Sequence, residues 1–135
     1  LQRPMGVALG ADGTCLVSES GAGRVARLHR GGVDTVLDGL QQPQGIFVRN
    51  DLLYVVDTGA KELIECDLRS GARRTIASAL PVGAPAGVVP KFLGAIGNMS
   101  GPMGPFAGIT GTADGTLYLS GDADGSILAL HPGKR

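Results

Sequence analysis

Acidic side chains recur at one position of the chain, and carboxylates are the first groups to consider for chemistry. Glu19 stands before Ser-Gly, Asp57 stands before Thr-Gly, and Asp122 follows Gly121 at the corresponding point of a later segment. A ring of such carboxylates would suit a hard cation such as Ca²⁺, which prefers oxygen ligands. A carboxylate beside a turn also accepts hydrogen bonds from the backbone N–H groups of that turn. We therefore favour a structural role, and we keep Glu19 and Asp57 as candidate binding residues.

Two histidines also occupy corresponding positions, and His is the side chain that most often serves as a general base. His29 and His131 each stand at the end of the predicted third strand of their unit, toward the outer part of the blade and away from a central site. Residues 122–125 (Asp-Ala-Asp-Gly) are similar to the start of a calcium loop but lack the closing Glu of an EF-hand. We therefore assign no catalytic residue and no metal ligand here, and we interpret 122–125 as a hairpin turn.

An internal repeat carries these residues. The segment 12–29 (DGTCLVSESGAGRVARLH) returns as 114–131 (DGTLYLSGDADGSILALH) at a constant offset of 102, and residues 51–67 form a looser third copy. The opening residues 1–7 return as 40–46 at an offset of 39. Internal repeats of this length are typical of propellers and solenoids.

Each repeat contains short apolar runs that are separated by Gly-containing turns, which is typical of antiparallel strands. The first unit predicts strands at 7–9, 14–19, 24–28 and 33–37, and the second at 52–57, 62–68 and 73–77. The third unit predicts strands at 116–120 and 126–130 and then lacks a fourth. The prediction is an all-β chain of three four-stranded blades of about 39 residues, the last incomplete: blade 1 at 1–39, blade 2 at 40–80 and blade 3 at 105–135.

The repeat is interrupted by an irregular loop at 81–104, which is rich in Gly and Pro and carries a single charge, Lys91. Long segments without strand or helix patterns are uncommon in compact domains and often carry function. Large or polar side chains of this loop that could contact a ligand are Lys91, Phe92, Asn98 and Met99. The alternative is a cover over the channel or over the edge of a blade.

Charge and composition limit the partners. Twelve basic and twelve acidic residues give a net charge of zero, so the chain lacks the positive footprint of a nucleic-acid-binding protein. No apolar run reaches membrane-spanning length, so no membrane association is expected. Cys15 and Cys66 lie on non-equivalent predicted strands, which predicts two buried free thiols and leaves the cellular compartment open.

The motifs Pro-x-Gly-Val, Asp-Gly and Leu-Tyr-Val-Val-Asp-Thr-Gly resemble those of NHL-repeat β-propellers and of the related SMP-30/gluconolactonase-like propellers. Residues 52–60 carry the resemblance most clearly, and only 81–104 falls outside it. In lactonase-like relatives, the resemblance implies a divalent metal in the channel, held partly by the middle residue of Pro-x-Gly. The corresponding residues here are Met5, Gln44 and Ala107, which are poor ligands for a hard cation.

We therefore expect an NHL-like module that binds a protein or small ligand through its channel face, including Gln44, and through the 81–104 loop. No cofactor is evident for such a module. The alternative is part of an SMP-30/gluconolactonase-like hydrolase that uses Ca²⁺ or another divalent metal.

The resemblance also bears on assembly, because such propellers have about six blades and this chain has three. Each end blade would leave one face open, and about 400 Å² of exposed apolar surface costs about 10 kcal/mol. The sequence therefore predicts either association with a second copy or membership of a longer chain that closes the ring.

Overall fold

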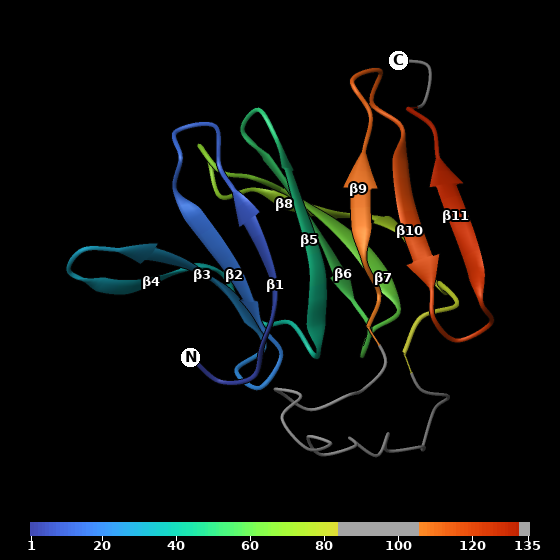
Figure 1. The fold of residues 1–135 in the computed structure, drawn as a ribbon, viewed down its shortest axis with the longest axis horizontal. Coiled ribbons are helices and arrows are strands. Elements are labelled where there is room, and N and C mark those ends of the chain that lie inside the picture. Colours follow the sequence, from blue (N-terminus) through green and yellow to red (C-terminus); the bar gives the residue numbers. More distant parts are fainter. Residues whose placement is uncertain (84–105, 133–135) are drawn as a thin grey trace, which may run out of the picture.

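Three antiparallel sheets make up the fold (Figure 1), as the computed structural model shows for residues 1–83 and 106–132. In each sheet the strands follow the chain order from one edge to the other. Blade 1 contains β1 (Pro4–Leu9), β2 (Cys15–Glu19), β3 (Arg24–His29) and β4 (Gly32–Leu37). Blade 2 contains β5 (Pro43–Arg49), β6 (Leu52–Asp57), β7 (Glu62–Asp67) and β8 (Arg73–Ala77). Blade 3 contains β9 (Ile109–Gly111), β10 (Leu117–Gly121) and β11 (Ser126–Leu130).

The all-β prediction with three blades is confirmed. No helix long and apolar enough for a membrane span occurs in the described ranges. The first strand of blade 1 is longer than predicted, because β1 already begins at Pro4. Its pairing with β2 shifts register between Pro4 and Gly6, so the Pro-x-Gly motif forms an irregular start to the strand.

Asp-Gly turns fix the first hairpin of blades 1 and 3. Gly13 and Gly115 have φ angles of 82° and 97°, which only glycine adopts without strain. The Oδ1 atom of Asp12 accepts the N–H of Thr14 at 2.9 Å, and Oδ1 of Asp114 accepts that of Thr116 at 3.0 Å. Hydrogen bonds lower the pKa of Asp114 to about 2. The bond from the Thr112 hydroxyl has the largest effect, and the bonds from Thr116 add to it.

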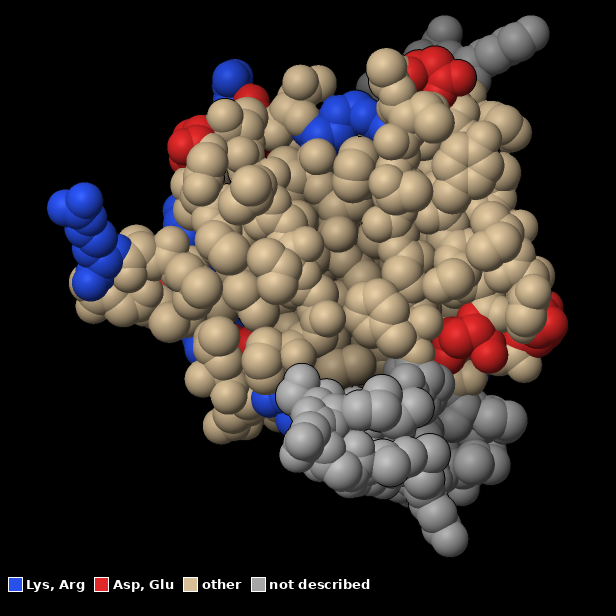
Figure 2. Space-filling view, in the orientation of Figure 1, with Lys and Arg blue, Asp and Glu red and all other residues tan. Residues whose placement is uncertain are grey.

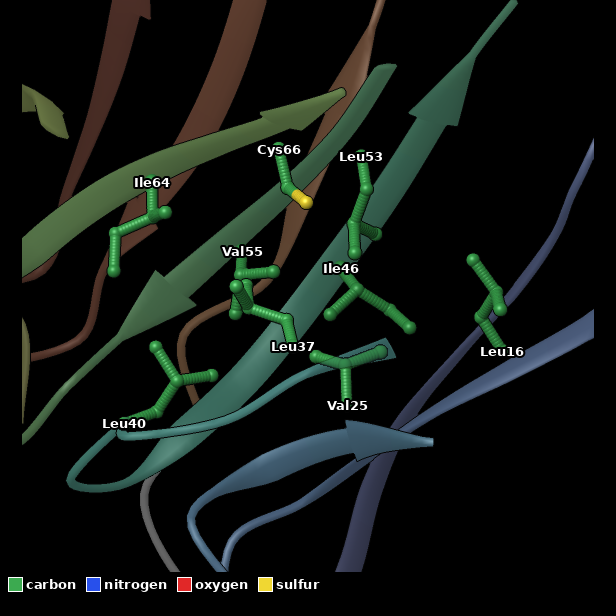
Figure 3. Packing of buried hydrophobic residues seen from close by; sticks show 9 residues of the cluster. All are labelled: Leu16, Val25, Leu37, Leu40, Ile46, Leu53, Val55, Ile64 and Cys66. Carbon is green, nitrogen blue, oxygen red and sulfur yellow. The ribbon is translucent and has the colours of Figure 1, made fainter. Parts of the chain in front are cut away.

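Two apolar layers lie between the blades, because side chains on a strand alternate between its two faces. The layer between blades 1 and 2 consists of nine buried residues, which point toward one another in Figure 3: Leu16, Val25, Leu37, Leu40, Ile46, Leu53, Val55, Ile64 and Cys66. The layer between blades 2 and 3 is built on Tyr54, Val56, Leu63, Leu80, Val82, Ala107, Leu117 and Leu119. We call the side of each blade that faces the next blade its forward face, and the opposite side its backward face.

The thiols differ in environment. Cys66 is buried in the layer between blades 1 and 2, and this burial raises the pKa of its thiol. Cys15 lies on the backward face of blade 1 and is only half-buried, so the prediction of two buried thiols is wrong for Cys15. The reason is its place at the start of β2, where its partner Leu9 is exposed and no described blade packs on it. Both cysteines are free, as predicted.

Glycines allow the first strands of neighbouring blades to lie in contact. A Cβ atom on Gly6 would lie 2.4 Å from the carbonyl oxygen of Gln44, and one on Gly45 would lie 2.4 Å from that of Ala107. Both distances are far below a van der Waals contact, so the Gly of the Pro-x-Gly motif is required by the packing of one blade on the next. The N–H of Gly45 donates to Ala107 O at 2.9 Å across the same contact.

Candidate functional site

The recurring acids bind the segment that leads into their own blade. Asp57 is buried, and its Oδ2 and Oδ1 atoms accept the N–H groups of Gln41 and Gln42, each at 2.9 Å. Its Oδ1 also accepts the N–H groups of Gly59 and Ala60 in the turn that follows. The carboxylate therefore joins the linker from blade 1 to the turn of blade 2.

Glu19 occupies the same place in blade 1, and Asp122 lies one residue beyond it in blade 3, directly after the last residue of β10. Glu19 accepts the N–H of Gln2 at 2.8 Å and the Nε–H of Arg24 at 2.5 Å. Asp122 accepts the N–H of Gly83 at 3.0 Å. We call Glu19, Asp57 and Asp122 the carboxylate clasp. Because the fold's own donors occupy these carboxylates, they do not form the ring of free acids that a channel cation would need.

Burial alone would raise the pKa of Glu19, but hydrogen bonds from Gln2 and Arg24 and the charge of Arg24 outweigh it, so the pKa lies below the ordinary 4.5. A lowered pKa means that Glu19 stabilises the fold above about pH 4.5, and that this stabilisation is lost as the pH falls through the lowered pKa. We expect the urea midpoints of the wild type and Glu19→Gln to differ most at pH 7 and to converge toward pH 3. A difference that does not change with pH would contradict this role.

Gln44 lies between the first strands and is also occupied. Its side chain is buried, and Oε1 accepts the N–H of Ala107 at 2.8 Å. Its carbonyl oxygen accepts a hydrogen bond from the Ser18 hydroxyl of blade 1. Gln44 therefore connects all three blades, and its amide oxygen is engaged by the backbone of blade 3.

Lys91, Phe92, Asn98 and Met99 fall outside the described residues, so their placement stays a prediction. Within residues 1–83 and 106–132, no group of three or more His, Cys, Asp or Glu side chains is arranged to hold a metal ion. Each histidine lies at the end of a third strand. His29 pairs with Asp34 at 3.2 Å on the surface, and the Nδ1 atom of His131 lies 3.3 Å from the Thr116 hydroxyl.

A polar cluster that the sequence interpretation missed lies in a cleft of about 430 Å³ between blades 2 and 3. Tyr54 and Glu65 are opposite each other on β6 and β7, and Arg74 is opposite Glu65 on β8. The Arg74 Nε–H donates to Glu65 at 2.9 Å. Burial raises the pKa of Tyr54, and its hydrogen bond with Glu65 raises it further, so Tyr54 stays a neutral phenol. The alternation of β6 and β7 contained this signal, because it places Tyr54 and Glu65 on one face.

The surface over the first strands of the three blades carries almost no charge. Figure 2 views the molecule from the side on which β1, β5 and β9 lie nearest the viewer, and Lys, Arg, Asp and Glu appear mainly at the margins. Contact with an uncharged or apolar partner suits such a surface better than binding of an ion.

Comparison with solved structures shows what this arrangement is. Virginiamycin B lyase from Staphylococcus aureus superposes with a TM-score of 0.58 at 15% identity, over 98% of this chain and 42% of that one. A putative oxidoreductase (glucose dehydrogenase) from Thermus thermophilus gives 0.65 at 19% identity, over 97% and 44%. A chain of the nidogen/laminin complex gives 0.57 at 20% identity, over 96% and 48%. All are β-propeller proteins.

The fold is a β-propeller. At these identities the similarity establishes the propeller architecture alone, and the neighbours have varied roles. No protein-family model matches the chain, and no curated protein sequence matches it either. The chain spans less than half the length of the propellers it superposes on, so it is an incomplete propeller.

Proposed function

We propose that this propeller chain is an NHL-like binding module that recognises a protein or small ligand through the channel face, the surface over β1, β5 and β9. The observation that carries the proposal is that the candidate polar side chains of the chain are already hydrogen-bonded within the fold. The carboxylate clasp and the Gln44 amide are hydrogen-bonded within the fold, and the channel face that remains is nearly uncharged (Figure 2). A surface of this kind offers shape and apolar contact to a partner.

Two further points support recognition in preference to catalysis. Met5 and Ala107 stand at two of the positions where the lactonase-like relatives hold their metal, and neither side chain carries an oxygen ligand. Tyr54, Glu65 and Arg74 form the most polar cluster described above, but these groups satisfy one another. The loop 81–104, with Lys91, Phe92, Asn98 and Met99, is proposed as a second contact region.

Calorimetry and turnover assays distinguish this proposal from the hydrolase alternative. We expect no heat of binding when CaCl₂ or MgCl₂ is titrated into the chain. We also expect no hydrolysis of a panel of γ- and δ-lactones, and no cleavage of quinupristin, the compound bound to one inactive virginiamycin B lyase. Stoichiometric metal binding together with turnover of any of these compounds would instead support an enzyme.

A peptide library displayed on phage tests the binding surface itself. Peptides selected on the wild type should lose about tenfold or more in affinity for Met5→Glu, because the substitution places a charge on the channel face. Ala11→Glu is the matched control, since Ala11 is exposed in the turn after β1 and away from that face. Light scattering on both variants verifies that their assembly state is unchanged. Equal binding to the two variants would place the recognition surface elsewhere.

A further inference from the structure

We propose that two copies of this chain close into one ring, with the forward face of blade 3 in each copy packed on the backward face of blade 1 in the other. The proposal concerns assembly and does not depend on the ligand-binding role. It follows from a comparison of equivalent positions in the three blades, because the same position is buried wherever a neighbouring blade is present.

The forward face of blade 3 repeats a pattern that is buried in blades 1 and 2. Ile127 is 71% exposed, whereas the equivalent Val25 and Leu63 are both 0% exposed. Tyr118 is 38% exposed, whereas the equivalent Leu16 and Tyr54 are 1% and 6% exposed. Blade 3 thus carries large apolar residues at the positions where the earlier blades use such residues to pack on the next blade.

The backward face of blade 1 has the complementary pattern. Val7 is 65% exposed, and the equivalent Ile46 of blade 2 is 6% exposed against blade 1. Leu9 is 67% exposed on the same side. Cys15, which pairs with Leu9, is half-buried, whereas the equivalent Leu53 is 0% exposed. Val17 and Ala26 in the middle of the same face are already buried in the single chain, so its open part is the apolar edge formed by Val7, Leu9 and Cys15. This edge belongs to the side that blades 2 and 3 use to receive a preceding blade.

Gly108 gives independent evidence from the backbone. Its equivalents Gly6 and Gly45 would each place a Cβ 2.4 Å from a carbonyl oxygen of the next first strand. A Cβ on Gly108 would meet nothing nearer than Phe106 at 3.5 Å. The glycine is therefore unexplained by the described part of the chain. It is explained if the Met5 carbonyl of a second copy lies there, because Met5 is equivalent to Gln44 and Ala107.

A second copy is the occupant that this chain itself supplies. It contains both halves of one blade-to-blade interface, and two copies satisfy both open faces at once. The exposed residues that the ring would bury on these faces include large apolar side chains, and apolar residues also form the layers between the blades within one chain. Two copies together have nearly the length of one of the propeller proteins compared above, since one copy covers 42–48% of those chains.

Light scattering on the 135-residue chain tests the assembly over a range of concentrations. We expect a mass of twice 13.7 kDa that does not grow further as the concentration rises. A mass of 13.7 kDa throughout would overturn the proposal, and would leave further blades of a longer chain as the occupant of these faces. Open-ended growth of the mass would overturn the closed ring.

Paired variants identify the faces. Ile127→Glu and Val7→Glu each place a charge in both interfaces of the ring, and we expect the dissociation constant to rise about 100-fold or more. An equimolar mixture retains one unmodified interface, so it should show the mass of two chains where each variant alone shows one. Ala11→Glu is the control and should associate like the wild type. A wild type that dimerises while the mixture does not would exclude pairing of blade 3 with blade 1.

Gly108→Ala and the Cys15 thiol provide two further measurements. The alanine should weaken association to a similar degree while circular dichroism stays unchanged. Cys15 should react slowly with a maleimide in the wild type and quickly in Ile127→Glu, with buried Cys66 as the unreactive reference. Normal association of Gly108→Ala, or equal Cys15 reactivity in both proteins, would overturn the packing of these two faces.

Discussion

Gly45→Ala is expected to lower the free energy of unfolding by about 3 kcal/mol, the upper part of the range for overpacking in a dense interior. A methyl group at residue 45 would lie 2.4 Å from Ala107 O and 3.0 Å from the Cα atom of Gly108. Both atoms belong to the backbone of the next blade, so no side-chain rotation relieves the clash. Blades 2 and 3 must move apart, which also weakens the hydrogen bond from Gly45 N to Ala107 O.

Urea denaturation followed by circular dichroism measures this effect. The control is Gly108→Ala in the Ile127→Glu background, which keeps the chain as a single copy under the assembly proposed above. There the nearest atom to the new methyl group lies at 3.5 Å, an ordinary contact, so we expect a change within about 0.5 kcal/mol. Similar midpoints for the two alanine variants would contradict the close approach of the first strands.

The sequence predicted the strands after the first one in each blade well because polar and Gly-containing turns limit them on both sides. β6, β8 and β11 have the predicted bounds. The start of β1 was missed, since Pro4 and Gly6 are residues that local propensity assigns to turns. Its extended conformation is a consequence of contact with the first strand of blade 2, which a single sequence does not reveal.

For the candidate site, only the hydrogen bonds between residues close in sequence could be predicted. The hydrogen bonds of Asp57 to Gly59 and Ala60 follow from the Asp-Thr-Gly pattern of the turn. Its bonds to Gln41 and Gln42 span 16 and 15 residues and depend on how the linker from blade 1 is placed. The link from Gln44 to Ala107 spans 63 residues and crosses the long loop, so no local pattern could indicate it.

Asp57→Ala is expected to lower the free energy of unfolding by about 3–5 kcal/mol, because it removes four part-buried hydrogen bonds and a typical hydrogen bond contributes about 1 kcal/mol to stability. Asp57 is 2% exposed and accepts four N–H groups, of which those of Gln41 and Gln42 belong to the linker from blade 1.

Asp57→Asn separates hydrogen bonding from volume, since its shape is the same as that of the aspartate. One amide oxygen can still accept, but the NH₂ group must then face either Gln41 N or Gln42 N, and a donor opposite a donor is repulsive. The asparagine variant should therefore lie between the wild type and Asp57→Ala in urea midpoint. Hydrogen exchange should show faster exchange at Gln41 and Gln42 in both variants, and fastest in the alanine variant.

Asp12→Ala is the matched control, because the carboxylate of Asp12 is hydrogen-bonded to the N–H and the hydroxyl of a single residue, Thr14, in an exposed turn. Its loss should cost less than about 1 kcal/mol, since water replaces the carboxylate as the acceptor. If Asp57→Ala shifts the urea midpoint no more than Asp12→Ala, the clasp does not hold the blades together. Glu19 and Asp57 would then have to be reconsidered as binding residues, because their position in the repeat would lack a structural cause.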